Sequence, residues 1–237
     1  MWKSYKVFMR KRDRMMFYLI FPLLCMILYA ILLIKLAPGL KSGELINFFD
    51  VNSKRTEMKM FVILLSILPC VPFFITDECS LGELFWKKKE SMDFLRRSRK
   101  GREVFIDAVK MDYVLRFATL ALIFGGAAIV EILIGAWHGY EFRSWSVRGI
   151  FFLLETVTCF MVTTLVNTLG RLISNGILRG VIIYLGMAIV VGVMTVEAGL
   201  YLWLIPVMVI LSLLLLGINV HVAKRKWEED ASDDQED

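Results

Sequence analysis

The charged residues inside long apolar runs are the first candidates for a chemical role in this sequence. Glu131 and Glu155 each interrupt such a run, and Lys35 lies at a comparable depth in another. Because a charged group costs roughly 2.5 to 3.5 kcal/mol at the middle of a bilayer and less toward its surface, we expect these side chains to face protein or water. Two interpretations stay open. Either an ion pair with Lys35 stabilises the fold, or the carboxylates line a cavity that attracts a cationic or amphipathic molecule.

The apolar run that carries Glu155 also holds many hydroxyl and amide side chains, namely Thr156, Thr158, Thr163, Thr164, Asn167 and Thr168. Such groups often form hydrogen bonds between helices in lipid, which is a packing role. If the carboxylates do line a path, we place two of these neighbours with them. The candidate path then consists of Glu131, Glu155, Thr156 and Asn167.

The sequence lacks the residue patterns of several other chemistries. Its two histidines, His138 and His221, fall on opposite faces of the expected membrane domain, so they cannot share a metal ion. Its four cysteines have no C-x-x-C spacing, and the chain contains neither a G-x-S-x-G nucleophile turn nor a G-x-x-x-x-G-K-[ST] phosphate loop. We therefore expect no catalytic residue, metal site or cofactor in this chain, which argues against an intramembrane enzyme.

The elements that position the charged residues are predicted to be membrane spans. Hydrophobic residues make up 57% of the 237 residues, and the mean hydropathy of +0.63 exceeds what one soluble core of this size can bury. A helix that crosses about 30 Å of hydrocarbon needs roughly 20 mostly apolar residues. Six segments meet this length, and we predict an all-α membrane protein with transmembrane helices over residues 15–36, 58–76, 113–135, 149–168, 177–196 and 199–222.

Basic residues in the short connections predict the orientation of these spans. Lys and Arg concentrate in residues 1–14, 77–112, 169–179 and 224–226, whereas the other connections carry few. Because basic residues in short loops stay on the cytoplasmic side, both termini and the 77–112 connection are predicted to be cytoplasmic. The isoelectric point near 9.0 then reflects the anionic inner leaflet rather than binding to nucleic acid.

The two ends of the chain have opposite character. Residues 1–14 place Trp2, Tyr5, Phe8 and Met9 at three- and four-residue spacing among Lys and Arg, which predicts an amphipathic helix in the membrane interface. A basic tail that only orients the first span is the alternative. Residues 223–237 end in a run of Asp and Glu with little apolar content, which predicts a disordered acidic tail after the membrane domain of residues 15–222.

The connection over residues 77–112 is the strongest functional signal. Its apolar residues Leu84, Phe85, Met92 and Leu95 recur at helical spacing around three consecutive lysines, which predicts a short amphipathic helix with a basic face. Basic residues 96–100 then lead to Gly101, after which a helix is expected to restart into the third span. A basic anchor that only fixes orientation is the alternative interpretation.

This connection resembles the coupling helix of ABC-2 type transporter permeases, which have six spans and carry that helix between the second and third. The residues that carry the resemblance are Glu78, Gly82, Phe94-Leu95, Ser98-Arg99 and Lys110. The sequence departs from the family pattern in two places: Arg96-Arg97 stands where the family has a proline, and Lys87 to Lys89 make the helix unusually basic.

The resemblance implies the permease subunit of an ATP-driven exporter in the cytoplasmic membrane, similar to peptide-exporter and lantibiotic-immunity permeases, including the phenol-soluble-modulin type. It implies a separate ATPase subunit that binds ATP and Mg, a second permease chain as a homo- or heterodimer, and an amphipathic peptide cargo. The implied ATPase contact comprises Glu83, Leu84, Phe85, Trp86, Lys87, Lys88, Lys89, Met92, Leu95, Arg96, Arg97 and Arg99. The alternative is a passive membrane carrier, or an immunity protein that binds its ligand without ATP.

Overall fold

Helices account for all the regular secondary structure that we describe in this chain. The computed structural model describes residues 1–36, 67–76, 98–137, 145–173, 175–194 and 198–232, and no strand occurs in these ranges. The elements are α1 (Trp2–Phe8), α2 (Lys11–Met15), the π-helix η1 (Met16–Ile20), α3 (Phe21–Leu36), the 3-10 helix η3 (Leu68–Cys70), α5 (Val71–Thr76), α8 (Gly101–Trp137), α9 (Trp145–Leu172), α10 (Gly176–Met194) and α11 (Ala198–Ser232).

Four helical segments in the described part of the chain are long and apolar enough to cross a membrane. They are Lys11–Ile31, Gly101–Ile134, Phe152–Leu172 and Trp203–Glu228, and they correspond to the predicted first, third, fourth and sixth spans. The fifth predicted span is α10, whose apolar part is the shorter Gly176–Val190. Most of the second predicted span, and the predicted coupling helix, lie outside the described residues. The regular structure of the described residues is thus entirely helical, and these four helices indicate a membrane protein.

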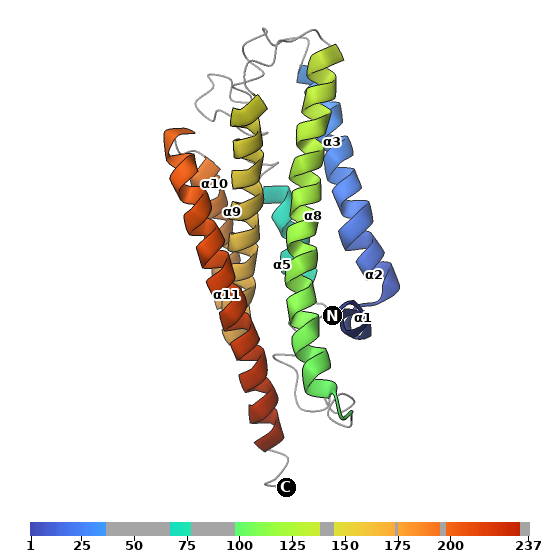
Figure 1. The fold of residues 1–237 in the computed structure, drawn as a ribbon, viewed down its shortest axis with the longest axis vertical. Helices are drawn as coiled ribbons and strands as arrows, with labels where there is room; N and C mark the ends of the chain where they lie inside the picture. The colour runs from blue at the N-terminus through green and yellow to red at the C-terminus, as the bar shows by residue number, and fades with distance from the viewer. Residues whose placement is uncertain (37–66, 77–97, 138–144, 174, 195–197, 233–237) are drawn as a thin grey trace.

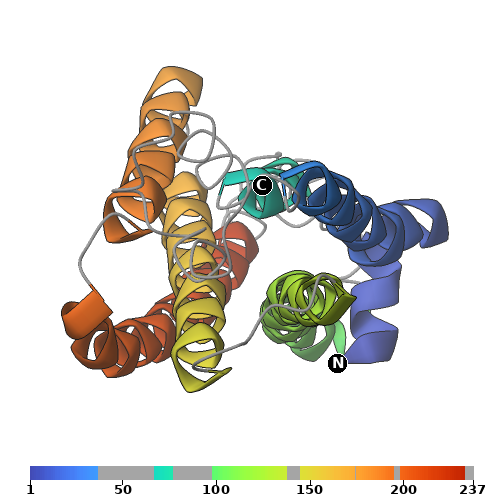
Figure 2. The same ribbon diagram turned by 90° about the horizontal axis from the view of Figure 1, so that it is seen from above.

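The helices form an elongated bundle with α9 at its centre. Helix α9 contacts η3, α5, α8, α10 and α11, whereas α3 packs on α8 (Figures 1 and 2). In the apolar segment of α9, 83% of the residues are buried, against 17% in the segment of α11. We call the lower end of the bundle in Figure 1, where α8 begins and α11 ends, the α1 end.

The polar residues of α9 are compatible with this central position because several of them form hydrogen bonds within α9 itself. The hydroxyl of Thr156 donates to the carbonyl of Phe152 at 2.8 Å, and Thr163 donates to the carbonyl of Cys159 at the same distance. A hydroxyl that bonds one turn back along its helix does not need a partner on another element. These two threonines therefore form bonds within α9, not the hydrogen bonds between helices that the sequence suggested.

Helix α1 crosses the long axis of the bundle instead of running along it (Figures 1 and 2). Tyr5 and Met9 are buried against a patch of α8 and α11, formed by Phe105, Ala108, Val109 and Ala223. The chain is extended at Arg10, and the Arg14 guanidinium donates to the Met9 carbonyl at 2.6 Å across this break. The segment 1–14, which was predicted to be one amphipathic helix, therefore forms α1 and most of α2. The apolar side of α1 packs against α8 and α11.

Helix α11 extends to Ser232, which differs from the disordered tail expected after residue 222. Ala223 is fully buried, and the Trp227 ring stacks on Phe105 of α8 at 6.3 Å. Arg102 also forms an ion pair of 2.7 Å with Glu228. These contacts with the first turns of α8 explain why the helix continues into the charged sequence.

We expect Gly186→Ala to weaken the contact between α9 and α10. A β-carbon at this position would lie 2.6 Å from Val166 Cγ2 and 3.1 Å from Val162 Cγ1, and β-branched side chains have little freedom to rotate away. Overpacking of this kind typically costs about 1–3 kcal/mol, so the melting temperature of the purified protein should fall. Gly180→Ala is the matched control on the same helix, because nothing lies within 4 Å of its β-carbon. Equal melting temperatures for the two variants would contradict the close contact.

Candidate functional sites

A charged group of side chains is buried at the α1 end of the bundle, where three long helices meet. Asp112 and Arg116 lie one turn apart on α8, and Arg116 Nη2 donates to Asp112 Oδ2 at 2.7 Å. Arg171, in the last turn of α9, approaches the same oxygen at 3.7 Å and donates to Asn219 Oδ1 of α11 at 2.8 Å. We call Asp112, Arg116, Arg171 and Asn219 the polar cluster. It connects α8, α9 and α11 through charge-assisted contacts.

Neighbouring groups of α9 and η3–α5 complete the surroundings of Arg116. Its Nη1 donates to the carbonyl of Thr163 at 3.0 Å, and its guanidinium lies 5.5 Å from the centre of the Phe73 ring. The Asn167 amide, with its oxygen turned toward Arg116, accepts from that side chain at 2.6 Å. A guanidinium with only 2% of its residue surface exposed needs several such partners, because burial removes its hydration.

Helix α1 reaches the polar cluster through Tyr5, which is fully buried. The Tyr5 hydroxyl contacts the Tyr18 hydroxyl and donates to Asp112 Oδ1 at 3.5 Å. Burial, followed by the nearby charge of Asp112, raises the pKa of Tyr5 well above its ordinary value of 10.0. Because the folded protein favours the neutral phenol, the contribution of Tyr5 to stability is fully present below pH 10 and is lost as the pH rises through the raised pKa. The terminal amine of Met1 adds an exposed ion pair of 3.2 Å with Asp107.

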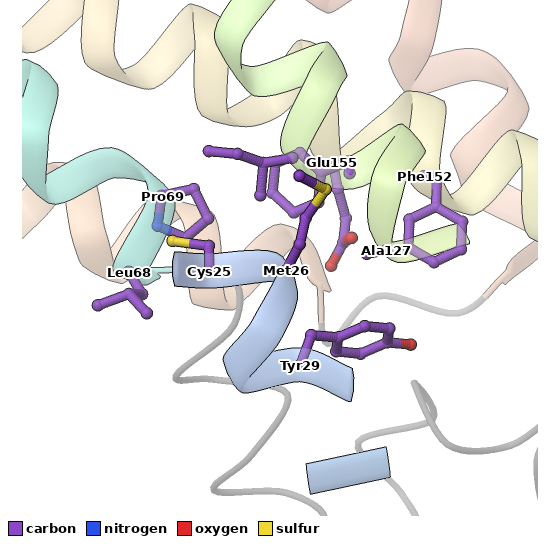
Figure 3. A pocket seen from close by; sticks show the side chains of 10 residues that line it. Cys25, Met26, Tyr29, Leu68, Pro69, Ala127, Phe152 and Glu155 are labelled. Carbon is purple, nitrogen blue, oxygen red and sulfur yellow. The ribbon is translucent and has the colours of Figure 1, made fainter. Parts of the chain in front are cut away.

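A second polar site lies toward the opposite end of the bundle, around Tyr29. A small hollow with a cavity volume of about 20 Å³ is lined by Cys25, Met26, Tyr29, Leu68, Pro69, Ile123, Phe124, Ala127, Phe152 and Glu155, from α3, η3, α8 and α9 (Figure 3). Glu155 and Tyr29 both point into this region. The Tyr29 hydroxyl donates to Glu131 Oε2 at 3.4 Å, so this tyrosine connects Glu131 to the hollow that Glu155 lines. We call this hollow the Tyr29 pocket.

The structure divides the four residues of the predicted path between two places. Glu131 and Glu155 are each 1% exposed; Glu155 lines the Tyr29 pocket, and Glu131 accepts a hydrogen bond from Tyr29. Asn167 lies beside Arg116 of the polar cluster, twelve residues and about 18 Å farther along α9 than Glu155. Thr156 is buried, does not line the pocket, and bonds within its own helix. The side chain of Lys35, the predicted ion-pair partner, lies outside the described residues.

Of the predicted ATPase contact, only Arg99 lies within the described part of the chain. It is exposed in the turn that precedes α8. The other residues of that prediction, from Glu83 to Arg97, lie outside the described residues. The backbone amide of Gly101 donates to the carbonyl of Ser98 at 2.9 Å, so this basic turn leads directly into α8.

Sequence reasoning did not find the polar cluster. Arg171 was considered only as a basic residue of the 169–179 connection that orients the chain, and Asp112 was placed at the end of the 77–112 connection. Two signals were present: opposite charges four residues apart at Asp112 and Arg116, and the amide Asn219 within an otherwise apolar run. What the sequence could not show is that three separate helices bring these residues together.

The described residues contain no group of three or more His, Cys, Asp or Glu side chains placed to hold a metal ion. Cys25, Cys70 and Cys159 are buried within the bundle. In the described part of the chain, the fold is helical, four helices are long and apolar enough to cross a membrane, and two polar sites are buried between helices. No protein-family model, curated protein or solved structure matches the chain.

Proposed function

We propose that this chain is the permease subunit of an ATP-driven exporter of the ABC-2 type, in the cytoplasmic membrane with both termini cytoplasmic. In this proposal a separate ATPase subunit binds ATP and Mg, and this chain pairs with a second permease chain. The cargo is an amphipathic or cationic peptide.

The observation that carries the proposal is the continuity of α8. This helix runs without interruption from Gly101 to Trp137, a length of about 55 Å. It begins directly after the basic Ser98-Arg99 turn of the sequence resemblance, and it carries Asp112, Arg116 and, toward its far end, Glu131. A displacement applied by a partner protein at the beginning of α8 would therefore move the polar cluster and one wall of the Tyr29 pocket together.

The distribution of charge supports the proposed orientation. The exposed basic residues of the described structure gather at the α1 end: Lys3, Lys6, Arg10, Lys11, Arg12, Arg99, Lys100, Arg102, Lys110, Lys224 and Arg225. Basic residues that flank spans favour the cytoplasmic side, so the α1 end is the cytoplasmic end in this proposal. An ATPase in the cytoplasm would then meet the connection that precedes α8.

The chemistry of the Tyr29 pocket supports a cationic or amphipathic cargo. Its lining is almost entirely apolar and includes the rings of Tyr29, Phe124 and Phe152. Glu155 lies in the same wall, and Glu131 is reached through Tyr29. Aromatic rings and carboxylates both attract cations, and apolar walls favour the hydrocarbon part of an amphipathic molecule.

The test of the proposal is co-purification of the tagged chain from its native membranes in a gentle detergent. We expect a P-loop ATPase in stoichiometric amount, and we expect its loss when Phe85→Asp is combined with Glu at positions 87, 88 and 89. The ATPase should be lost because the Phe85 ring would no longer fill its apolar groove, and because the three lysines that complement its charge would be replaced by acids.

The matched control replaces Lys224, Arg225 and Lys226 by Glu, because it reverses three charges at the same end of the bundle on α11. This control should retain the ATPase. If no ATPase co-purifies even after mild crosslinking, the proposal is wrong and a passive carrier or ligand-binding protein takes its place.

A further inference from the structure

The face of α1 that points away from the bundle carries positive charge. Lys3, Lys6, Arg10, Lys11 and Arg12, from α1 and the beginning of α2, are all exposed. We call these five residues the basic face. Of the nearby acids, Asp13 lies 3.7 Å from the largely exposed guanidinium of Arg12. Such a surface pair contributes little, so the basic face keeps most of its charge.

The geometry of α1 places this charge where a membrane surface would be. The helix crosses the long axis of the bundle, so it runs parallel to the surface of any bilayer that the long helices span (Figures 1 and 2). Apolar side chains are exposed beside the basic face, among them Trp2 at 44% and Val7 at 53%. Lys6 and Arg14 lie over the Trp2 ring at 5.2 and 5.7 Å, a combination of aromatic and basic groups that suits the headgroup region.

The opposite side of α1 is fixed to the protein rather than to lipid. Tyr5 is fully buried, and the Phe8 ring meets Phe105 of α8 edge-on at 6.1 Å. The same Tyr5 hydroxyl contacts Asp112, whose other oxygen binds Arg116 and lies near Arg171. One short helix thus presents charge outward and touches the polar cluster inward.

We propose that the basic face of α1 binds an anionic membrane surface, and that Tyr5 transmits this binding to the polar cluster inside the bundle. The attraction of each Lys or Arg to an anionic leaflet adds to that of its neighbours, so the five residues together hold α1 in its docked position. The composition of the lipid would thereby set how firmly α8, α9 and α11 are held together at this end. This inference does not depend on the transport function proposed above.

The experiment compares the full chain in nanodiscs of neutral phosphatidylcholine and in nanodiscs that also contain phosphatidylglycerol. Hydrogen exchange is measured at the amides of α1 and at those of residues 108–116. We expect anionic lipid to slow exchange in α1 about tenfold, and more at low salt than at high salt, since charge attraction is screened. Exchange at residues 108–116 should also slow, but less, because these residues respond only through the contact of Tyr5 with Asp112.

Three variants separate the parts of the proposal. Replacing the five residues of the basic face by Gln should abolish the response of α1 to anionic lipid. The matched control, with Gln at Arg99, Lys100, Lys110, Lys224 and Arg225, loses as many charges at the same end and should keep the response. Tyr5→Phe removes only the hydroxyl, so α1 should still respond to lipid while residues 108–116 no longer do.

Two results would overturn the proposal. Equal exchange of α1 in neutral and anionic nanodiscs would show that the lipid does not bind the basic face. A response of residues 108–116 that survives Tyr5→Phe would show that Tyr5 does not transmit it. Neither measurement requires an ATPase or a cargo, so their outcome is distinct from that of the co-purification.

Discussion

Asp112→Asn is expected to destabilise the protein more than any other single substitution considered for the bundle. The carboxylate lies between two buried guanidinium groups, at 2.7 Å from Arg116 and 3.7 Å from Arg171. Removal of one partner from a buried ion pair costs about 3–5 kcal/mol, because the remaining charge is left in a medium that solvates it poorly. Thermal unfolding in detergent, followed by size-exclusion fluorescence, should show a large loss of folded protein.

Asp107→Asn is the matched control for this result. It makes the same chemical change five residues earlier on α8, where the side chain is 38% exposed and pairs with the amino terminus. Exposed pairs contribute about 0–1 kcal/mol, so this variant should unfold near the wild-type temperature. If both variants were equally stable, the polar cluster would not hold the three helices together.

Simultaneous replacement of Glu131 and Glu155 by Gln is expected to reduce transport at least tenfold. The change keeps the shape of the Tyr29 pocket and removes its negative charge, while a tenfold effect corresponds to about 1.4 kcal/mol of lost interaction with a cationic cargo. The measurements are resistance of cells to a cationic amphipathic peptide and the ATP hydrolysis that this peptide stimulates in the reconstituted complex. This prediction depends on the proposed function.

The control for the pocket variant is Glu103→Gln, which removes one carboxylate from an exposed position on the first turn of α8. Transport should be unchanged in this control. If the double variant of the pocket transported normally but melted at a lower temperature, the two carboxylates would have a structural role, as the ion-pair interpretation with Lys35 holds.

The sequence predicted the helical class and the approximate position of most spans, because both depend on local composition. The run of apolar residues after Tyr113 indicates a span wherever it packs. A helix that restarts after Gly101 and leads into this span was also expected, whereas the structure begins the helix at Gly101 itself. The extension of α11 through Trp227 was not expected, because it depends on the contact of Trp227 with Phe105, which is distant in the sequence.

Of the two polar sites, the carboxylates near Tyr29 were predicted from the sequence and the polar cluster was not. Glu131 and Glu155 stood out because a carboxylate in an apolar run is costly, whatever surrounds it. Asp112 did not, because it lies at the edge of a charged connection, and its burial became visible only once Tyr5 and Arg171 were placed beside it. The free-energy cost of placing a charge in an apolar run can be predicted from local sequence. The partners that offset this cost cannot, because tertiary contacts bring them together.

The central position of α9 has a consequence for how the protein is made. This helix is the least apolar of the four long membrane helices, and it carries Asn167 and Arg171, which lipid cannot solvate. Their partners include Arg116 and Asp112 on α8, which is synthesised earlier. During insertion α9 would therefore leave the translocon against α8 rather than alone, so these two helices enter the bilayer as a pair and give the later α10 and α11 a surface on which to assemble.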